Sequence, residues 1–355
     1  MIIEDLLKEL VEKKGSDLHI SNALPPVARI DGKLVRLDYD PLTPEGVESL
    51  LFPMMSNEQR RHLEQEWELD FSYGVEGIGR FRVNFYKDKG CYAAAFRTIA
   101  TTAPQLEELG MPPVVTTIAE KPRGLVLVTG PTGSGKSTTL AAMVDYINRT
   151  RAEHILTIED PVEFVHTSKV SIIHQRELGM DTRSFANALK SALREDPDII
   201  LVGEMRDHET IALALTAAET GHLVFGTLHT SSASQTIDRI IDVFPEGQQQ
   251  QIRVQLANSL VAVFSQTLLP KRQPDGSRKG RVMAQEIMVV TPAIANLIRE
   301  AKAAQIYSTI QTSSGSGMQT LESALAELFK KGLVTIEDAL SKSSKPAELK
   351  RLIQG

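Results

Sequence analysis

The feature that most restricts the fold is the segment Gly130-Pro-Thr-Gly-Ser-Gly-Lys-Ser137, which matches the pattern G-x-x-x-x-G-K-[ST] at every position. The apolar run Leu125–Thr129 before it predicts a buried strand, and the segment Ser137–Asn148 after it predicts a helix. Such a loop points backbone N–H groups inward, and the helix adds the positive end of its dipole, so the two together bind phosphate. The sequence therefore predicts a phosphate-binding P-loop in an α/β domain with a parallel sheet.

Residues of this loop have separate expected roles. Gly133 and Gly135 let the backbone wrap a phosphate, Lys136 can reach the β- and γ-phosphates of ATP, and the Ser137 hydroxyl can bind Mg²⁺. The predicted nucleotide contacts are Gly130, Pro131, Thr132, Gly133, Ser134, Gly135, Lys136, Ser137 and Thr138. The alternative, an ordinary glycine-rich turn between a strand and a helix, is disfavoured by the complete match and by the flanking context.

Carboxylates follow two further predicted strands, at the edge where a parallel sheet binds its ligands. The apolar run Ile199–Val202 leads into Glu204, which we predict to be catalytic and to contact Mg²⁺, with its long side chain able to act through a water molecule. Ile155–Ile158 leads into a segment with three acids, of which Glu163 is the candidate that polarises the attacking water. A solvated surface acid for Glu204, and helix-start acids or surface ion pairs around Glu163, remain as alternatives.

A histidine stands at each end of another predicted strand, Leu223–Leu228. His229 follows the carboxyl end, so it is the candidate that senses the γ-phosphate. His222 precedes the strand, and a structural role is as compatible with its position as a functional one.

The chain is expected to have two main parts. Residues 1–100 alternate apolar and polar positions between turns, which predicts an α+β domain with an antiparallel sheet. Residues 101–122 carry several prolines and are predicted to be a linker with a short helix inside it. Apolar strands alternating with helices over 123–270 predict the P-loop ATPase core, and 271–355 is predicted to be mainly helical.

Composition excludes several classes of protein. The net charge of −6 argues against a general nucleic-acid binder, and Cys91 as the sole cysteine excludes an internal disulfide or a cysteine-rich zinc site. No run approaches the roughly 18 apolar residues needed to cross a bilayer, and the start of the chain lacks the features of a secretory signal. We therefore expect a cytoplasmic protein whose contact with a membrane is peripheral.

These features together resemble the secretion ATPases that drive type II secretion and type IV pili, and most fully the pilus retraction motors among them. The resemblance is carried by an N-terminal signature, an aspartate box, a Walker B stretch, a histidine box and two C-terminal motifs, which are Gly15–Ile20, Thr157–Glu163, Leu201–Asp207, Gly221–Thr230, Ala293–Glu300 and Gly317–Thr320. It covers nearly the whole chain.

The resemblance implies a PAS-like N-terminal domain, a RecA-like ATPase domain and a homohexameric ring that hydrolyses ATP with Mg²⁺ to power pilus retraction and twitching motility. It implies that Arg82 and Arg97 act as arginine fingers on the nucleotide of a neighbouring subunit, although the sequence pattern alone favours a solvated polar face for them. It also implies a position at the cytoplasmic face of the inner membrane, held there by a pilus platform protein.

Two alternatives remain open at this point. One is a pilus-assembly or type II secretion ATPase of the same family; the assembly motor usually carries a four-cysteine zinc site, which a chain with Cys91 alone cannot form. The other is a nucleotide-gated binding protein with negligible turnover, against which the carboxylates near the loop argue. The chain departs from the retraction motif at Ala295, where an arginine is usual.

Overall fold

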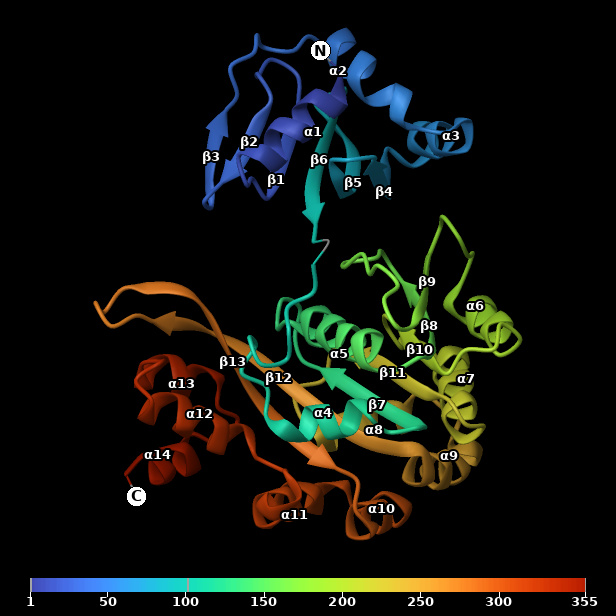
Figure 1. The fold of residues 1–355 in the computed structure, drawn as a ribbon, viewed down its shortest axis with the longest axis vertical. Coiled ribbons are helices and arrows are strands. Elements are labelled where there is room, and N and C mark those ends of the chain that lie inside the picture. Colours follow the sequence, from blue (N-terminus) through green and yellow to red (C-terminus); the bar gives the residue numbers. More distant parts are fainter. Residues whose placement is uncertain (1, 101, 355) are drawn as a thin grey trace. The chain divides into compact units, whose positions relative to one another are not determined.

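The computed structural model describes residues 2–100 and 102–354. The chain divides into two compact units (Figure 1): an N-terminal unit of Met1–Thr102 with Pro161–Val165, and an ATPase unit of Ala103–Asp160 with His166–Gly355. None of the helices within the described residues is both long enough and apolar enough to cross a membrane.

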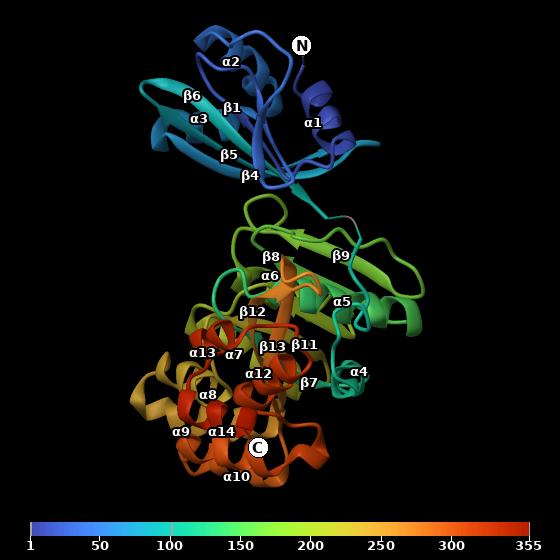
Figure 2. The same cartoon turned by 90° about the vertical axis from the view of Figure 1, so that its left-hand side faces the viewer.

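The N-terminal unit is an α+β structure with an antiparallel six-stranded sheet in the order β3-β2-β1-β6-β5-β4 (Figures 1 and 2, blue to cyan). Its strands are β1 Asp17–Ile20, β2 Val27–Ile30, β3 Lys33–Arg36, β4 Glu68–Val75, β5 Gly79–Asp88 and β6 Cys91–Ile99, and its helices are α1 Ile3–Glu12, α2 Pro44–Leu51 and α3 Asn57–Glu66. Alternate residues Phe81, Val83 and Phe85 are fully buried in a core shared with the apolar side of α1, as the period of two in a strand requires.

The ATPase unit is built on a seven-stranded sheet in the order β13-β12-β7-β11-β10-β8-β9, parallel except for β13 at one edge. The strands are β7 Gly124–Thr129, β8 His154–Glu159, β9 Ile172–Glu177, β10 Ile199–Val202, β11 Leu223–Leu228, β12 Leu260–Arg272 and β13 Arg278–Val289. The helices are α4 Pro113–Ala119, α5 Lys136–Thr150, α6 Phe185–Ala192, α7 His208–Glu219, α8 Ala233–Asp242 and α9 Glu246–Ser259, followed by α10 Pro292–Arg299, α11 Ile306–Thr312, α12 Leu321–Lys330, α13 Ile336–Lys342 and α14 Pro346–Gln354.

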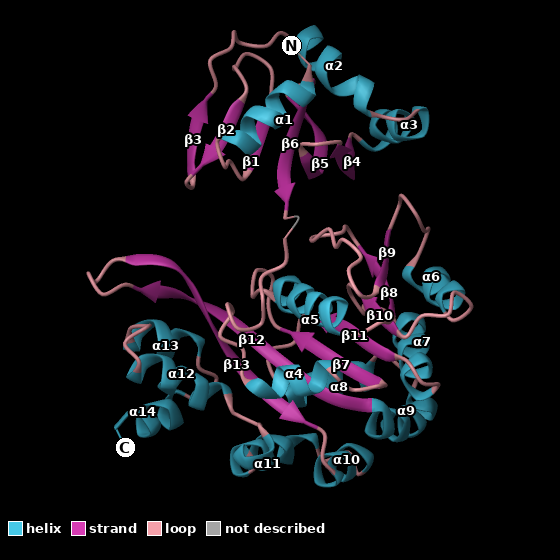
Figure 3. Cartoon of the chain, in the orientation of Figure 1, coloured by secondary structure: helices cyan, strands magenta, loops and turns pink. Residues whose placement is uncertain are grey.

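Helices cover both faces of this sheet (Figure 3). Alternate residues of β7 belong to different cores: Leu125 and Leu127 join the core that holds α7, α8 and α10, whereas Val126 and Val128 join the core that holds α4 and α5. Burial on both faces explains why the central strands are continuous apolar runs. The predicted α/β class with a parallel sheet is confirmed.

The segment that the sequence marks as a linker has a structure of its own. Thr101 lies outside the described residues, but from Ala103 onward the chain belongs to the ATPase unit. Helix α4 places Val115 and Ile118 in the core beneath α5. The C-terminal region is mainly helical, with β13 as its one long strand among the described residues.

Candidate functional site

The candidate site lies along one edge of the parallel sheet of the ATPase unit. Strands β7, β11 and β10 are consecutive neighbours and run parallel, so the segments that follow them leave the sheet at the same edge (Figure 3). The P-loop follows β7, His229 follows β11, and Glu204 follows β10. This is the edge where parallel α/β sheets bind ligands.

The backbone of the P-loop requires its glycines. Gly130, Gly133 and Gly135 have φ angles of 142°, 76° and 89°, which side chains with a Cβ rarely adopt. A Cβ at Gly130 would also collide with the carbonyl oxygen of Gln266 on β12. The loop therefore holds its conformation both by its own dihedral angles and by contact with the neighbouring strand.

Lys136 begins helix α5 and turns back over the loop. Its Nζ donates hydrogen bonds to the carbonyl oxygens of Gly130, at 2.9 Å, and Pro131, at 3.3 Å. Ser137 and Thr138 occupy the first turn of the same helix and are half-buried. The lysine charge, the hydroxyl groups and the positive end of the helix dipole thus meet at the loop, which is the arrangement that holds a phosphate chain.

Glu204 and His229, which the sequence marks separately, are in direct contact. One carboxylate oxygen of Glu204 lies 3.1 Å from Nε2 of His229, and the other accepts a hydrogen bond of 2.6 Å from Arg206. Burial raises the pKa of the Glu204 carboxyl, but Arg206 and His229 lower it by more, so the net pKa lies below its ordinary value. An ionised carboxylate at this edge can bind a divalent cation or orient a water molecule.

The backbone around Glu204 is fixed by both neighbouring strands. The N–H of Gly203 donates to the carbonyl of Ile158 on β8 at 2.7 Å, and the Thr227 hydroxyl on β11 donates to the Gly203 carbonyl. A Cβ at Gly203 would lie 3.1 Å from the backbone of Glu159, which explains a glycine directly before the acid. Sequence reasoning misses Arg206, because an exposed arginine in a loop carries no pattern of its own.

His222 has the structural role that the sequence left open. Its Nδ1 lies 2.9 Å from the carbonyl oxygen of Ala217, and its backbone N–H also donates to that oxygen, so the histidine closes the end of α7. This contact satisfies a carbonyl that the helix itself leaves without a partner.

Three predicted site residues belong to the N-terminal unit instead. Glu163 is exposed on the segment Pro161–Val165. Arg82 and Arg97 are directly opposite each other on β5 and β6, so their side chains share one face of the sheet. The Arg97 guanidinium is 2.9 Å from Asp17, yet its side chain is 72% exposed. The site that the ATPase unit builds contains none of these three, and their roles stay predictions.

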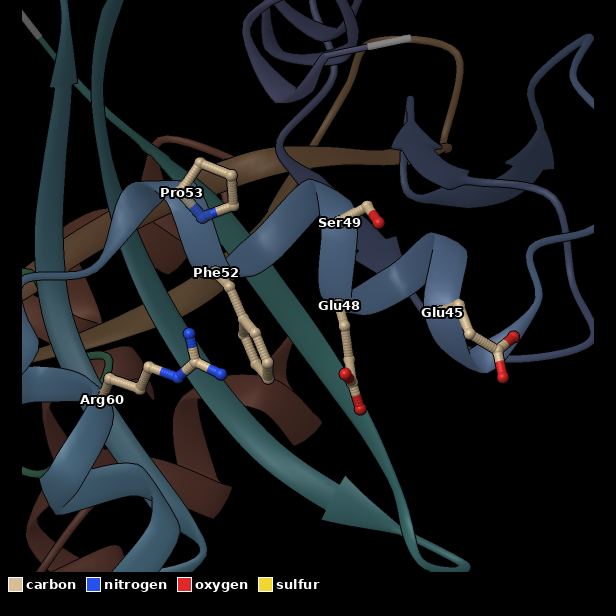
Figure 4. A pocket seen from close by; sticks show the side chains of 6 residues that line it. All are labelled: Glu45, Glu48, Ser49, Phe52, Pro53 and Arg60. Atoms are coloured by element: carbon tan, nitrogen blue, oxygen red, sulfur yellow. The ribbon is translucent and has the colours of Figure 1, made fainter.

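A surface hollow of about 460 Å³ also lies in the N-terminal unit (Figure 4). It is lined by Glu45, Glu48, Ser49, Phe52, Pro53 and Arg60. The guanidinium of Arg60 lies 4.3 Å from the centre of the Phe52 ring, a cation–π contact that occupies part of the hollow. No predicted site residue lines it.

The oxygen groups of the site fit Mg²⁺, which prefers oxygen ligands. Within the described ranges, no three His, Cys, Asp or Glu side chains gather as a metal cage. Mg²⁺ is commonly held by one or two protein oxygens together with substrate phosphates, and the Ser137 hydroxyl and the Glu204 carboxylate are groups of that kind.

Comparison with known sequences assigns a family over most of the chain. Residues 1–341 match the family described as type II/IV secretion system protein. The chain is 55% identical to the type IV pilus retraction ATPase PilT of Pseudomonas aeruginosa, over 98% of this chain and 99% of that protein. It is also 55% identical to a twitching motility protein of Neisseria gonorrhoeae, over 88% of this chain and 83% of that protein.

Comparison with solved structures gives the same result for the fold. The crystal structure of the pilus retraction motor PilT with bound ADP superposes with a TM-score of 0.91 at 50% identity, covering 99% of both chains. The ATPase DotB of Legionella pneumophila superposes with a TM-score of 0.77 at 27% identity, over 95% of this chain and 94% of that one.

Proposed function

This chain belongs to the type II/IV secretion system protein family, and we propose that it is the ATPase motor that retracts a type IV pilus. The observation that carries the proposal is the identity of 55% with a retraction ATPase over nearly the full length of both chains. The geometry supports it, because the P-loop, an ionised acid and a histidine meet at one edge of the ATPase sheet.

The site residues divide the work of hydrolysis, in which water attacks the γ-phosphate of ATP to give ADP and phosphate. Backbone N–H groups of the loop and the Lys136 ammonium stabilise the charge on the phosphate oxygens. Mg²⁺, bound together with ATP, would be held by Ser137 and Glu204 and would neutralise part of that charge. His229 senses the γ-phosphate in this proposal, and its contact with the Glu204 carboxylate supports that role. Glu163 lies in the N-terminal unit, outside this site, and its proposed role is to polarise the attacking water.

The subunits form a homohexameric ring in which Arg82 and Arg97 act on the nucleotide of a neighbour. Their exposure on a shared sheet face supports this, because an arginine finger must reach another chain. Arg97 would exchange its ion pair with Asp17 for the neighbour's phosphate. The ring works at the cytoplasmic face of the inner membrane, where it engages the pilus platform protein.

The alternative of a type II secretion or pilus-assembly ATPase is less well supported. The type II secretion relatives are 33–35% identical and match only part of their own length, for example 44% of the Xanthomonas campestris protein. The chain also has only Cys91, so it cannot form a four-cysteine zinc site.

Deletion of the gene tests the direction of work. A strain without this protein should carry excess pili and fail to move across a surface, since extension would continue without retraction. Purified protein should release phosphate from ATP in steady state. If the deletion strain has no pili, the protein is an assembly ATPase and not a retraction ATPase. If the purified protein binds ATP without releasing phosphate, it is a nucleotide-gated binding protein and not a motor.

A further inference from the structure

A row of amide side chains lies directly beneath the P-loop, inside the ATPase unit. Gln266 on β12 and Gln285 on β13 are each 3% exposed. β12 lies between β7, which leads into the loop, and β13 (Figure 1). Gln319, in the C-terminal motif Gly317–Thr320, donates from Nε2 to the backbone carbonyl of Gln285 at 2.9 Å. Neither the predicted catalytic groups nor the predicted nucleotide contacts include any of the three.

Gln266 is hydrogen-bonded to the loop and to the helix that follows it. Its Nε2 donates to the carbonyl oxygen of Ser134 at 2.9 Å, and its Oε1 accepts from the Thr139 hydroxyl at 3.0 Å. Gln285 Nε2 donates to the same Oε1 at 3.1 Å. All the partners lie in a buried setting, where an amide left without hydrogen bonds is costly, so this orientation of Gln266 is strongly preferred.

The Ser134 carbonyl and the Gln285 amide determine which end of the Gln266 amide faces the loop. If the amide rotated by half a turn, its NH₂ group would face the NH₂ of Gln285 and its oxygen would face the Ser134 carbonyl. Both new contacts would be repulsive, because an amide nitrogen only donates and a carbonyl oxygen only accepts. The Ser134 carbonyl and Gln285 together keep the Gln266 donor directed at the loop.

The hydrogen bond to Ser134 also orients the next N–H group of the loop. A trans peptide is planar, so the carbonyl of Ser134 and the N–H of Gly135 point in opposite directions. Because Gln266 holds the Ser134 carbonyl toward β12, the Gly135 N–H points away from β12. A P-loop presents its N–H groups to phosphate in this way. Gly135 has a φ of 89°, and a Cβ there would lie 3.3 Å from Nε2 of Gln266, so the strand supports the loop closely at this residue.

We propose that Gln266 is a positioning residue that holds the Ser134–Gly135 peptide in the orientation that binds phosphate, and that Gln285 fixes the orientation of Gln266. This assignment goes beyond the motor function and rests only on the P-loop being the nucleotide site. Gln319 links the motif Gly317–Thr320 to the same strand through its hydrogen bond to the Gln285 backbone.

Replacement of Gln266 by glutamate gives a nearly isosteric test in the full-length protein. The variant Gln266→Glu keeps an acceptor for Thr139 and Gln285 but sets an oxygen against the Ser134 carbonyl. We expect its dissociation constant for Mg²⁺-ADP, measured by titration calorimetry, to rise about tenfold. That is the effect of losing one hydrogen bond to a charged group, here the bond from the Gly135 N–H to a phosphate. The KM for ATP should rise with it.

Ser265→Ala is the matched control on the same strand. Ser265 is also buried, and its hydroxyl bonds to Thr129 at 2.8 Å, at the end of β7 and outside the loop. This variant loses a buried hydrogen bond, so its melting temperature should fall, while its dissociation constant for ADP should stay within about twofold of the wild type. A merely structural role for Gln266 predicts the same behaviour for both variants.

The outcomes separate the proposal from the site assignment. If the wild type binds ADP and folded Gln266→Glu binds it equally well, Gln266 does not position the loop. Should Gln266→Glu fail to fold, Gln285→Leu supplies the test. It removes one of the two donors to the Gln266 oxygen and should weaken ADP binding several-fold. Unchanged binding there overturns the proposal. A wild type that does not bind ADP would instead overturn the P-loop assignment.

Discussion

Glu286→Gln removes a buried ionisable group from the ATPase unit while nearly conserving its shape. Glu286 is 4% exposed on β13, and its carboxylate accepts a hydrogen bond of 2.7 Å from the N–H of Ala233, at the start of α8. Burial raises the pKa of this carboxyl to about 7; the Ala233 N–H acts against the shift, the nearby Glu322 adds to it and Lys345 opposes it. A glutamine oxygen can accept the same hydrogen bond.

The raised pKa means that the folded state holds a proton that the unfolded chain releases. Stability from this group is therefore fully present below the unfolded pKa of 4.5 and is lost as the pH rises through 7. At 1.36 kcal/mol per pKa unit, the loss amounts to about 3 kcal/mol at about pH 8 and to less than about 1 kcal/mol at about pH 5. Glutamine does not titrate, so the variant escapes this loss.

Thermal unfolding across this pH range measures the effect. The melting temperature of Glu286→Gln should exceed that of the wild type by several degrees at about pH 8, and the two should converge toward about pH 5. The exposed carboxylate Glu337 provides the control, since Glu337→Gln should leave the pH dependence unchanged. Parallel pH profiles for the wild type and Glu286→Gln would refute the reasoning.

Three further predictions concern the motor. The variants Glu204→Gln and Glu163→Gln should each bind Mg²⁺-ATP but hydrolyse it roughly 10²–10⁴-fold more slowly in a phosphate-release assay. If either variant keeps more than about a third of wild-type turnover, the catalytic role proposed for that glutamate is wrong. Mixed rings of Lys136→Ala and Arg97→Ala subunits, each inactive alone, should regain part of the activity, because an arginine supplied in trans is worth roughly 10³–10⁵ in rate; full activity of dilute monomer would rule out trans action. Leu297→Ala should abolish pilus retraction in cells while the purified variant keeps most of its ATPase activity. If retraction and ATPase activity fall equally, α10 has a packing role only.

Local sequence predicts the P-loop well because its strand, loop and helix are contiguous. The apolar run, the glycines and the helical period lie within about 25 consecutive residues, so no long-range contact is needed to recognise them. Glu204 and His229 are likewise predictable one at a time, since each follows an apolar strand. Their contact at 3.1 Å depends on β10 and β11 being neighbours, which strand order in the sheet decides and sequence spacing does not.

Elements with mixed patterns are harder to predict. Strand β9 reads Ile-Ile-His-Gln-Arg-Glu and lies at the sheet edge with Ile172 59% exposed, so it lacks the apolar run of a central strand. The short helix expected inside the linker segment is α4, but the few periodic apolar positions there do not indicate that Val115 and Ile118 join the core of the ATPase unit. Gln266 lies in the polar run Ser265–Thr267, which interrupts the apolar stretch Leu260–Leu269, and that interruption marks the run without singling out Gln266.

The motif Ala293–Glu300 shows what residue spacing can predict and what it cannot. Ile294 and Ile298 are fully buried on one face of α10, as their spacing predicts. Ala295 is also buried, at 7% exposure, and Arg299 donates to Asn258 of the same chain at 3.0 Å. The spacing indicates the apolar face, but it does not indicate that Arg299 is engaged within its own subunit.

Imaging of labelled pili on living cells tests the central claim most directly. A deletion strain that expresses the wild-type chain should show pili that extend and then shorten. The same strain expressing Lys136→Ala should show pili that extend and remain extended, because the loop loses the cation that contacts the β- and γ-phosphates. Pili that shorten at the wild-type rate with Lys136→Ala as the sole copy would contradict the account of this protein as the ATP-driven retraction motor.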